Sequence, residues 1–409
     1  MAKVLISFVG TGSLEKGKSE SDMKSAREYR KACYHLGEQD LGEFPFVAAA
    51  LSSAHQVDKV ILIGTVHSMW EEVYRYFSEK NGKRIDENVY LSIAEYCESA
   101  NASSPLELPH KSEIEGAVGD ARIEIIKYGV TEEKISENIN KVLKLSEQFS
   151  SGDEVIVDIT HSFRSLPILI MNLLIYMKNV GRKKINISHI YYGMLEISKE
   201  KGYAPIIDLK KVMELSDWIT GAYSFSQYGN AYKVVELLED TDASISSRLK
   251  KFSDELNLNH LDALEKEVCN LSAMKNNVYC SPLAEMVVKP VVDDFLRSFN
   301  VVKGKHSLFQ FRIARWQFEH RNYGSALLSL QESILTYICE QEGMEWKDMN
   351  NRKKAKESLN LNMYPELQCY WQIKKMRNCV AHSLKTERNA ESMIVKLRKS
   401  LNRLEKVIK

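Results

Sequence analysis

An arginine and a histidine near the end of the chain have the chemistry needed to cut RNA. Arg377 and Asn378 are neighbours, and His382 follows five residues after the arginine. Histidine titrates near neutral pH, so it can handle the protons of an attacking 2′-hydroxyl and a leaving 5′-oxygen. Arginine can hold the charge that develops on the phosphorus, and Asn378 adds a neutral donor and acceptor. Together these residues could cleave RNA without a metal ion.

The spacing of this pair leaves a second interpretation open. Five residues on a helix correspond to about 140° of rotation beyond one full turn, so Arg377 and His382 do not share a helix face. A helix end or a small distortion between them would let both side chains reach one pocket. Otherwise the arginine is a surface charge and the histidine caps the helix. A single arginine and a single histidine provide few catalytic groups for an active site. A symmetric homodimer would bring two such pairs to one interface.

A second group of polar residues follows three predicted strands in the first half of the chain. Glycines let a backbone approach a phosphate, and hydroxyl groups can donate hydrogen bonds to it. A helix beginning near Leu166 would direct its free N–H groups toward the same space, and Arg164 could add a bidentate contact. The three groups are residues 10–12, 64–65 and 160–165.

These motifs differ in what they establish. Gly10 and Gly12 alone fit an ordinary tight turn. Glu15 stands where the dinucleotide-binding fingerprint requires a glycine, so the sequence does not indicate a dehydrogenase. The segment 158–167 places Thr, His, Ser and Arg between a strand and a helix, which favours ligand binding over helix capping alone. His161 could still be an ordinary loop histidine.

Alternating strand and helix patterns position these residues. We expect strands over residues 4–9, 60–63, 123–126, 155–159, 185–192 and 204–207. Helices are expected over residues 46–54, 69–77, 132–149 and 166–180, with Thr131 as a capping residue. Such alternation predicts an α/β Rossmann-like domain with a parallel, doubly wound sheet, which binds ligands at the carboxyl ends of its strands.

After about Asp208 the strand patterns stop and helical periods continue to the end. We predict an N-terminal domain over residues 1–210, a helical connector over residues 211–300 and an all-α domain over residues 301–409. The last domain carries 21 Lys and Arg against 11 Asp and Glu, whereas the whole chain has a net charge of only +1. A basic region of this kind suits a polyanion, although it can also be a solvated helical face. Its long helices are expected over residues 309–342, 370–381 and 387–407.

The composition fits a soluble globular protein, with 44% hydrophobic and 27% charged residues over 409 positions. The longest apolar run, residues 167–177, is too short to span a bilayer, and the start of the chain does not resemble a secretory signal. We therefore expect a cytoplasmic protein. Seven scattered cysteines without a C-x-x-C pair argue against a disulfide framework and against a structural zinc.

Three motifs in order resemble the CRISPR-associated Rossmann-like (CARF) domain of type III accessory proteins. They are residues 6–12, 63–70 and 158–167, and the resemblance spans most of residues 1–210. The ligand-binding residues that it implies are Gly10, Thr11, Gly12, Thr65, Thr160, His161, Ser162 and Arg164. Many relatives have a glycine where this chain has Ser162. Residues 13–44 match less well, so Lys18, Arg27 and Tyr34 receive no role.

Arg377 and His382 match the signature of HEPN ribonucleases, an arginine and a histidine separated by four to six residues. With the N-terminal motifs, the chain resembles the CARF–HEPN effectors of type III CRISPR antiviral systems. The resemblance implies that a homodimer, or a higher oligomer, binds a cyclic oligoadenylate across its CARF cleft, with cyclic tetra-adenylate the expected ring. Binding would activate cleavage of single-stranded RNA by paired Arg377 and His382, with no cofactor or metal required.

Two other functions remain open. Some relatives also slowly cut the messenger in the CARF cleft, so the chain could be a messenger-degrading nuclease with a helical scaffold. Alternatively, the N-terminal domain is a sensor whose helical part binds nucleic acid or a partner without cutting. Substituting His382 separates this last function from a ribonuclease, because a binding module does not need the histidine.

Overall fold

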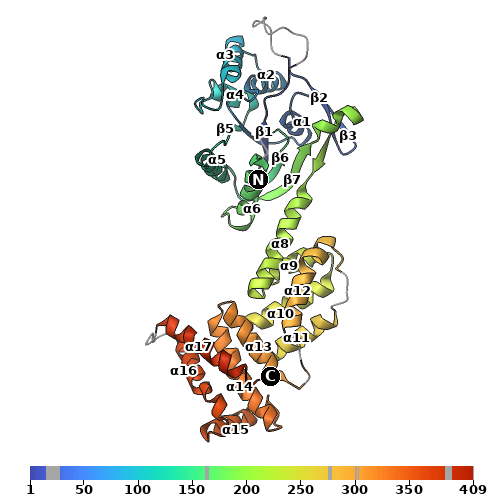
Figure 1. Ribbon diagram of the computed structural model, residues 1–409. Coiled ribbons are helices and arrows are strands. Elements are labelled where there is room, and N and C mark those ends of the chain that lie inside the picture. The colour runs from blue at the N-terminus through green and yellow to red at the C-terminus, as the bar shows by residue number, and fades with distance from the viewer. Residues whose placement is uncertain are drawn as a thin grey trace. The chain divides into compact units, whose positions relative to one another are not determined.

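The computed structural model of the chain divides into two compact units, Met1–Glu214 and Leu215–Lys409 (Figure 1). The boundary falls within one helix, α8 (Lys210–Tyr228). The structure describes residues 1–14, 28–161, 165–274, 279–299, 302, 304–382 and 389–408.

An eight-stranded sheet forms the centre of the first unit. Its strands are β1 (Lys3–Val9), β2 (Ala32–Leu36), β3 (Gln39–Phe44), β4 (Lys59–Gly64), β5 (Ala121–Ile125), β6 (Glu154–Asp158), β7 (Asn186–Gly193) and β8 (Ala204–Asp208). Their order across the sheet is β3-β2-β8-β7-β6-β1-β4-β5. The pairs from β7 to β5 are all parallel. Six strands lie where the sequence predicts them, and β2 and β3 were not predicted.

The prediction of a wholly parallel sheet is wrong at one edge. β8 pairs with β7 antiparallel, and β2 and β3 form an antiparallel hairpin, so the sheet is mixed. The hairpin has no continuous apolar run because it carries Gly37 and Gly42, both with positive φ, and the acidic side chains of Asp40 and Glu43. A strand at the sheet edge does not need to be apolar throughout, and its pattern is therefore weak.

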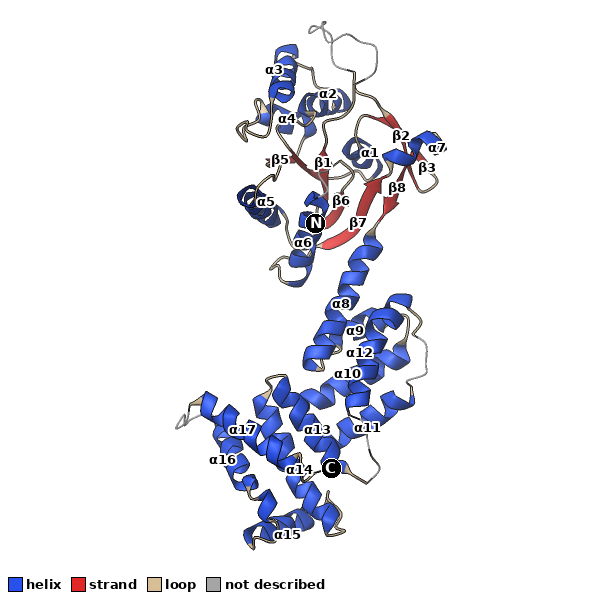
Figure 2. Ribbon diagram, in the orientation of Figure 1, coloured by secondary structure: helices blue, strands red, loops and turns tan. Residues whose placement is uncertain are grey.

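Helices cover both faces of this sheet, as Figure 2 shows. Alternate residues of β1 point to opposite sides: Leu5 and Val9 enter a core with α1–α4, whereas Val4, Ile6 and Phe8 enter a core with α5 and α6. The central strands are thus apolar on both faces. The helices are α1 (Val47–Ala54), α2 (Trp70–Lys80), α3 (Glu87–Ser99), α4 (Lys111–Val118), α5 (Glu132–Lys144), α6 (Ser165–Asn179) and the short α7 (Ser198–Lys201).

The predicted cap of α5 is confirmed. The Thr131 side chain accepts a hydrogen bond from the backbone N–H of Lys134 at 3.4 Å. The α-helix is shorter than expected, because it ends at Lys144 and a 3-10 turn, Leu145–Gln148, continues the chain. Leu145 and Phe149 are nevertheless buried, so the apolar period that suggested a longer helix still marks the packed face.

The regular elements described beyond Asp208 are all helical, as predicted. After α8 these are α9 (Tyr232–Leu238), α10 (Ala243–Leu258), α11 (Leu261–Ala273), α12 (Lys289–Ser298), α13 (His306–Glu319), α14 (Tyr323–Gln341), α15 (Met349–Asn360), α16 (Cys369–His382) and α17 (Ala390–Leu404). A short π-helical turn, Ala284–Val288, precedes α12, and a 3-10 turn, Pro365–Leu367, precedes α16. Among the helices in these described ranges, none is both long and apolar enough to cross a membrane.

The single helix expected over residues 309–342 is in fact two helices. α13 ends at Glu319, and Arg321 adopts a left-handed conformation with φ +62°. Asn322 then caps α14 by accepting a hydrogen bond from the backbone N–H of Ser325 at 3.4 Å. Both helices pack their apolar faces in the same region, so the apolar period continues from α13 into α14. The periodicity of the sequence therefore gives no sign of the turn between them.

α13 contributes to two hydrophobic cores of the second unit. Phe309 and Ile313 lie in the core with α9–α12, whereas Phe311, Ala314 and Phe318 lie in the core with α14–α17. Residues 215–409 form one compact unit, so the predicted division into a connector and a separate all-α domain at residue 300 stays a prediction.

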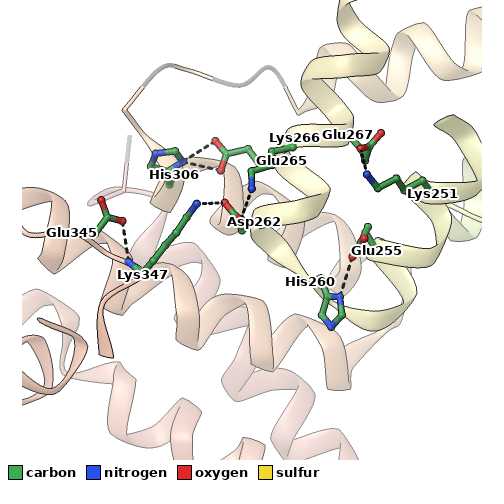
Figure 3. Close-up of polar contacts among 10 residues, drawn as sticks. All are labelled: Lys251, Glu255, His260, Asp262, Glu265, Lys266, Glu267, His306, Glu345 and Lys347. Carbon is green, nitrogen blue, oxygen red and sulfur yellow. Dashed lines mark hydrogen bonds and ion pairs between the residues drawn. The ribbon is translucent and has the colours of Figure 1, made fainter. Parts of the chain in front are cut away.

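Polar contacts also join the helices on either side of residue 300 (Figure 3). The ring nitrogen Nδ1 of His306 lies 2.8 Å from the carboxylate of Glu265 on α11. The ammonium group of Lys347 lies 2.6 Å from the carboxylate of Asp262 on the same helix. α11 is therefore held to the chain beyond residue 300 by these polar contacts as well as by apolar packing.

Candidate ligand cavity and candidate nuclease site

A cavity of about 720 Å³ lies where the central parallel strands end. The chain winds from β1 to β4 and β5 on one side and places β6 and β7 on the other, so the direction of winding changes beside β1. Ligands bind at such switch points in open α/β sheets. Six of the eight predicted ligand residues line this cavity, namely Gly10, Thr11, Gly12, Thr65, Thr160 and His161. Ser162 and Arg164 lie outside the described residues.

The two glycines after β1 allow close packing at the cavity wall. Gly12 has φ +68°, and a side chain there would begin 2.6 Å from the ring of Tyr29 and 2.7 Å from the sulfur of Met69. A side chain at Gly10 would begin 3.3 Å from the β-carbon of His161. The positive φ fits the tight turn that the sequence suggested, and the turn itself forms part of the cavity wall.

The loop after β4 is tied to the end of β1. The Ser68 hydroxyl donates to the carbonyl of Val9 at 2.6 Å and accepts from the backbone N–H of Thr65 at 3.1 Å. The indole N–H of Trp70 donates to the carbonyl of Thr65 at 2.7 Å. Thr65 is 5% exposed, so these hydrogen bonds fix a buried loop beside the cavity rather than a mobile one.

Thr160 connects β6 to β7 through its hydroxyl group. The hydroxyl donates to the Asp158 carboxylate at 2.5 Å and accepts from the backbone N–H of Gly193 at 2.7 Å. The backbone N–H of Thr160 also donates to Asp158, at 2.9 Å. A hydroxyl has one proton to donate, so Thr160 could contact a ligand only by accepting a hydrogen bond or through its methyl group.

Asp158 and His161 form a buried pair of titratable groups at the end of β6. The Ser7 hydroxyl on β1 donates to the Asp158 carboxylate. Burial raises the pKa of Asp158, and burial lowers the pKa of His161. His161 Nε2 is buried without a hydrogen-bond partner among the residues that the structure describes. Buried polar atoms usually have partners, so this nitrogen in the cavity wall is a candidate to contact a ligand.

Sequence reasoning missed the basic residues of the cavity. Arg30 and Lys31, just before β2, and Lys199 on α7 line it, and Glu43 on β3 is the acidic residue among the described lining. Positive charge around a site at strand ends suits an anionic ligand. No pattern in the sequence identifies these residues, because the β2–β3 hairpin next to Arg30 and Lys31 has no clear strand signal, and Lys199 comes from the short helix α7, which was not predicted.

The predicted nuclease residues lie together on α16. Arg377 and Asn378 are half-buried, whereas His382 is exposed and is the last residue of the helix. The guanidinium Nε of Arg377 donates to the side-chain oxygen of Gln331 on α14 at 3.3 Å. The helix is continuous from Arg377 to His382, so the two side chains leave it about 140° apart. The helix end or distortion between the two residues that would let both reach one pocket is therefore not found in this described segment.

The first unit matches a known domain family. Residues 4–196 match the CARF domain of the CRISPR system endoribonuclease Csx1. The chain carries a CARF domain. The cavity at the strand ends is lined mostly by residues of this matched region. Residues 214–305, most of the predicted connector, match a second family, the second domain of CRISPR-associated protein MJ1674.

The full-length protein of that name is a relative over most of this chain. CRISPR-associated protein MJ1674 of Methanocaldococcus jannaschii is 32% identical over 412 residues, which cover 94% of this chain. The chain spans 62% of the length of that relative. The matches are thus to CRISPR-associated proteins, and the match over residues 4–196 is to a CARF domain.

One solved structure is similar to this chain at a low level. Csm6 of Enterococcus italicus, solved with cyclic hexa-2′-fluoro-hexa-dAMP bound, is 12% identical. The comparison covers 100% of this chain and 94% of that one, with a TM-score of 0.39. A likeness at this level leaves the arrangement of the site to be argued from the chain's own residues.

Proposed function

We propose that this chain is a CRISPR-associated ribonuclease that a cyclic oligoadenylate switches on. The ring binds the CARF cavity, with cyclic tetra-adenylate the first candidate, and the helical second unit acts as a HEPN-type nuclease. Arg377 and His382, assisted by Asn378, then cleave single-stranded RNA without a metal ion.

The observation that carries the ligand proposal is the cavity itself. It lies at the switch point of the sheet, and its described wall includes three basic residues, four glycines and His161, whose Nε2 has no hydrogen-bond partner among the described residues. Glycines permit close approach of a phosphate, the basic groups attract it, and α6 begins beside the cavity with its positive end. An adenylate ring joined by phosphodiester bonds, with one negative charge on each phosphate, fits this combination of charge and shape.

The nuclease proposal rests on the chemistry of Arg377 and His382. The 2′-hydroxyl of RNA loses its proton and attacks the adjacent phosphorus, the bond to the 5′-oxygen breaks, and that oxygen takes up a proton. An imidazole can move these protons, and a guanidinium stabilises the charged phosphorane. One chain offers one arginine–histidine pair, and the second chain of a homodimer would supply a second pair.

An exposed apolar face supports the proposal of a homodimer. Ile135, Ile139 and Leu143 follow one another at four-residue intervals on α5, and their exposed fractions are 41%, 37% and 39%. Ile168, in the second turn of α6, is 63% exposed. A second copy would remove this surface from water.

A second candidate function is a sensor with a non-catalytic helical unit. The structure offers one observation in its favour: Arg377 is already bonded to buried Gln331, and His382 points from a different side of the same helix. An arginine in such a contact can be purely structural. The candidates differ in whether substitution of His382, an exposed residue that the fold does not need, abolishes RNA cleavage.

The test uses the full chain and three alanine variants. His382→Ala and Arg377→Ala should each lower RNA cleavage by at least about 100-fold and leave the affinity for cyclic tetra-adenylate unchanged. Gln372→Ala, an exposed residue of the same helix, is the control and should retain both activities. If His382→Ala cleaves RNA at the normal rate, the helical unit is not a nuclease of this kind.

The cavity has a test of its own. His161→Ala should weaken binding of cyclic tetra-adenylate by about tenfold, because a direct hydrogen bond from the ring nitrogen is lost. His110→Ala, at a partly exposed position before α4, is the matched control and should bind normally. Equal affinity of the two variants would remove His161 from the ligand site.

A further inference from the structure

The β2–β3 hairpin brings together three side chains with different metal-binding atoms. Cys33 and His35 are two apart on β2, so they share a face of the strand. Asp40, on β3, is the cross-strand partner of His35. The thiol sulfur, an imidazole nitrogen and a carboxylate oxygen all lie within 4.8 Å of one another.

The spacing of these atoms is close to that of a tetrahedral metal site. The Cys33 sulfur lies 3.4 Å from the Asp40 Oδ1, and the His35 Nε2 lies 3.6 Å from the same oxygen. In a tetrahedral zinc site the bonds are about 2.3 Å to sulfur and about 2.0–2.2 Å to nitrogen and oxygen, so two ligand atoms stand about 3.4–3.6 Å apart. Two edges of the tetrahedron already have the required length.

The fold holds these three side chains in place. The pairing of β2 with β3 shifts register between Tyr34 and His35, which brings Asp40 opposite His35. The His35 ring stacks on Tyr203, with centroids 3.9 Å apart and planes 24° apart. The backbone N–H of Gly42 donates to Asp40 Oδ1 at 2.8 Å. Ligands positioned by a second set of contacts bind metal more tightly than free ones.

Local charge also favours a cation beside the thiol. The carboxylates of Asp40 and Glu43 both come from β3: Asp40 lies 3.4 Å from the Cys33 sulfur, and Glu43 is the cross-strand partner of Cys33. These two carboxylates would be neutralised in part by a divalent ion. Metal binding would release the thiol proton and replace the Cys33–Asp40 hydrogen bond with bonds to the metal.

We propose that Cys33, His35 and Asp40 bind a divalent cation of the zinc class, with a fourth position open to water or an anion. Sulfur, nitrogen and oxygen donors together suit zinc better than magnesium or calcium, which prefer oxygen alone. Cys33 also lines the CARF cavity, so the open position would lie at its edge. The proposal does not depend on the cyclic oligoadenylate function.

The sequence argued against zinc because the cysteines form no C-x-x-C pair. That argument covers sites built from two closely spaced cysteines, whereas this one has a single cysteine, a histidine two residues later and an aspartate from the next strand. Only the strand pairing reveals that the three belong together.

The experiment is a metal titration of the full-length chain. After removal of bound metal, cobalt added in increments should give a thiolate-to-cobalt absorption band that saturates at one equivalent, and zinc should displace it. Cys33→Ala should abolish the band, and Asp40→Asn should weaken cobalt affinity by at least about tenfold. Cys269→Ala, which removes an exposed cysteine on α11, is the control and should behave like the parent chain.

Circular dichroism should be recorded for each variant to check that it is folded. An unfolded variant would lose metal because the hairpin is lost and not because a ligand atom is missing. Asp40 is largely exposed, with 63% of its side chain accessible, so Asp40→Asn is the variant expected to fold normally. If the folded parent chain gives no thiolate band, or if Cys33→Ala retains it, the site does not exist.

Discussion

The guanidinium Nε of Arg377 on α16 donates a hydrogen bond to the side-chain oxygen of Gln331 on α14 across 3.3 Å. Gln331 is only 4% exposed, so the partner of the proposed catalytic arginine is fixed in the core. The contact orients one end of a long, otherwise flexible side chain. It makes Gln331 a positioning residue for the proposed reaction.

Gln331→Leu should therefore impair RNA cleavage without removing a catalytic group. The substitution keeps the volume but leaves Arg377 without this acceptor, and misplacement of a catalytic group by about 1 Å can cost about 100-fold in rate. We expect kcat to fall about 10- to 100-fold while KM for RNA and the affinity for cyclic tetra-adenylate change little. A normal kcat in the folded variant would show that the contact has no role in positioning.

Gly12 should be intolerant of any side chain. Gly12→Ala combines a positive φ with contacts under 3 Å to Tyr29 and Met69, so the free energy of unfolding should fall by about 2–4 kcal/mol. Gly37→Ala is the matched control, because φ is +62° there and the added carbon meets nothing within 4 Å. It should cost about 1 kcal/mol. Denaturant unfolding measures both, and equal losses would mean that the contacts around Gly12 relax freely.

Much of the first unit could be predicted from the sequence, and the reason is physical. β1, β4 and β6 are buried on both faces, so each is a short apolar run, and the polar residues that follow them gather at one edge because parallel strands end together. The edge hairpin was missed, since its polar residues and glycines give no strand pattern. The antiparallel direction of β8 was also missed, because side-chain pattern does not encode strand direction.

The remaining errors have similar causes. The turn between α13 and α14 depends on the left-handed Arg321, a residue type that gives no turn signal. The basic residues of the cavity, Arg30, Lys31 and Lys199, come from segments whose position only the sheet order fixes. The same holds for the acceptor of Arg377, since nothing in the spacing of α14 and α16 identifies Gln331.

Thr160 should matter for stability as well as for any ligand. Thr160→Val keeps the shape of the side chain but removes the hydrogen bond to Asp158 and the acceptor of the Gly193 N–H. The free energy of unfolding should fall by about 1–3 kcal/mol. Thr160→Ser retains the hydroxyl and should cost much less. If the two variants are equally stable in denaturant unfolding, the hydroxyl does not hold β6 to β7.

Glu72 on α2 predicts a pH dependence of stability. Burial raises its pKa to about 7 from an ordinary value of 4.5, although the Arg75 guanidinium 2.5 Å away opposes the shift. A pKa that is higher in the folded chain stabilises the fold fully below the unfolded value, and this stability is lost as the pH rises through about 7. Glu72→Gln removes the titration.

The parent chain should thus lose on the order of 2 kcal/mol more than Glu72→Gln between about pH 5 and about pH 8.5. Glu79→Gln, at an exposed position of the same helix, should follow the parent. Unfolding free energies at several pH values measure this difference. Parallel curves for the parent and Glu72→Gln would show that the carboxyl is ionised throughout.

The most direct measurement of the proposed function is cleavage of a fluorescent single-stranded RNA by the full chain, with cyclic tri-, tetra- and hexa-adenylate added separately. Each reaction is run with and without EDTA, and the Cys33→Ala variant is included, so that any loss caused by the proposed metal site is recognised. We predict that one ring, expected to be cyclic tetra-adenylate, switches on cleavage that EDTA does not stop and that His382→Ala lacks. Binding of a ring without cleavage under any of these conditions would contradict the nuclease and leave a CARF sensor with a non-catalytic helical unit.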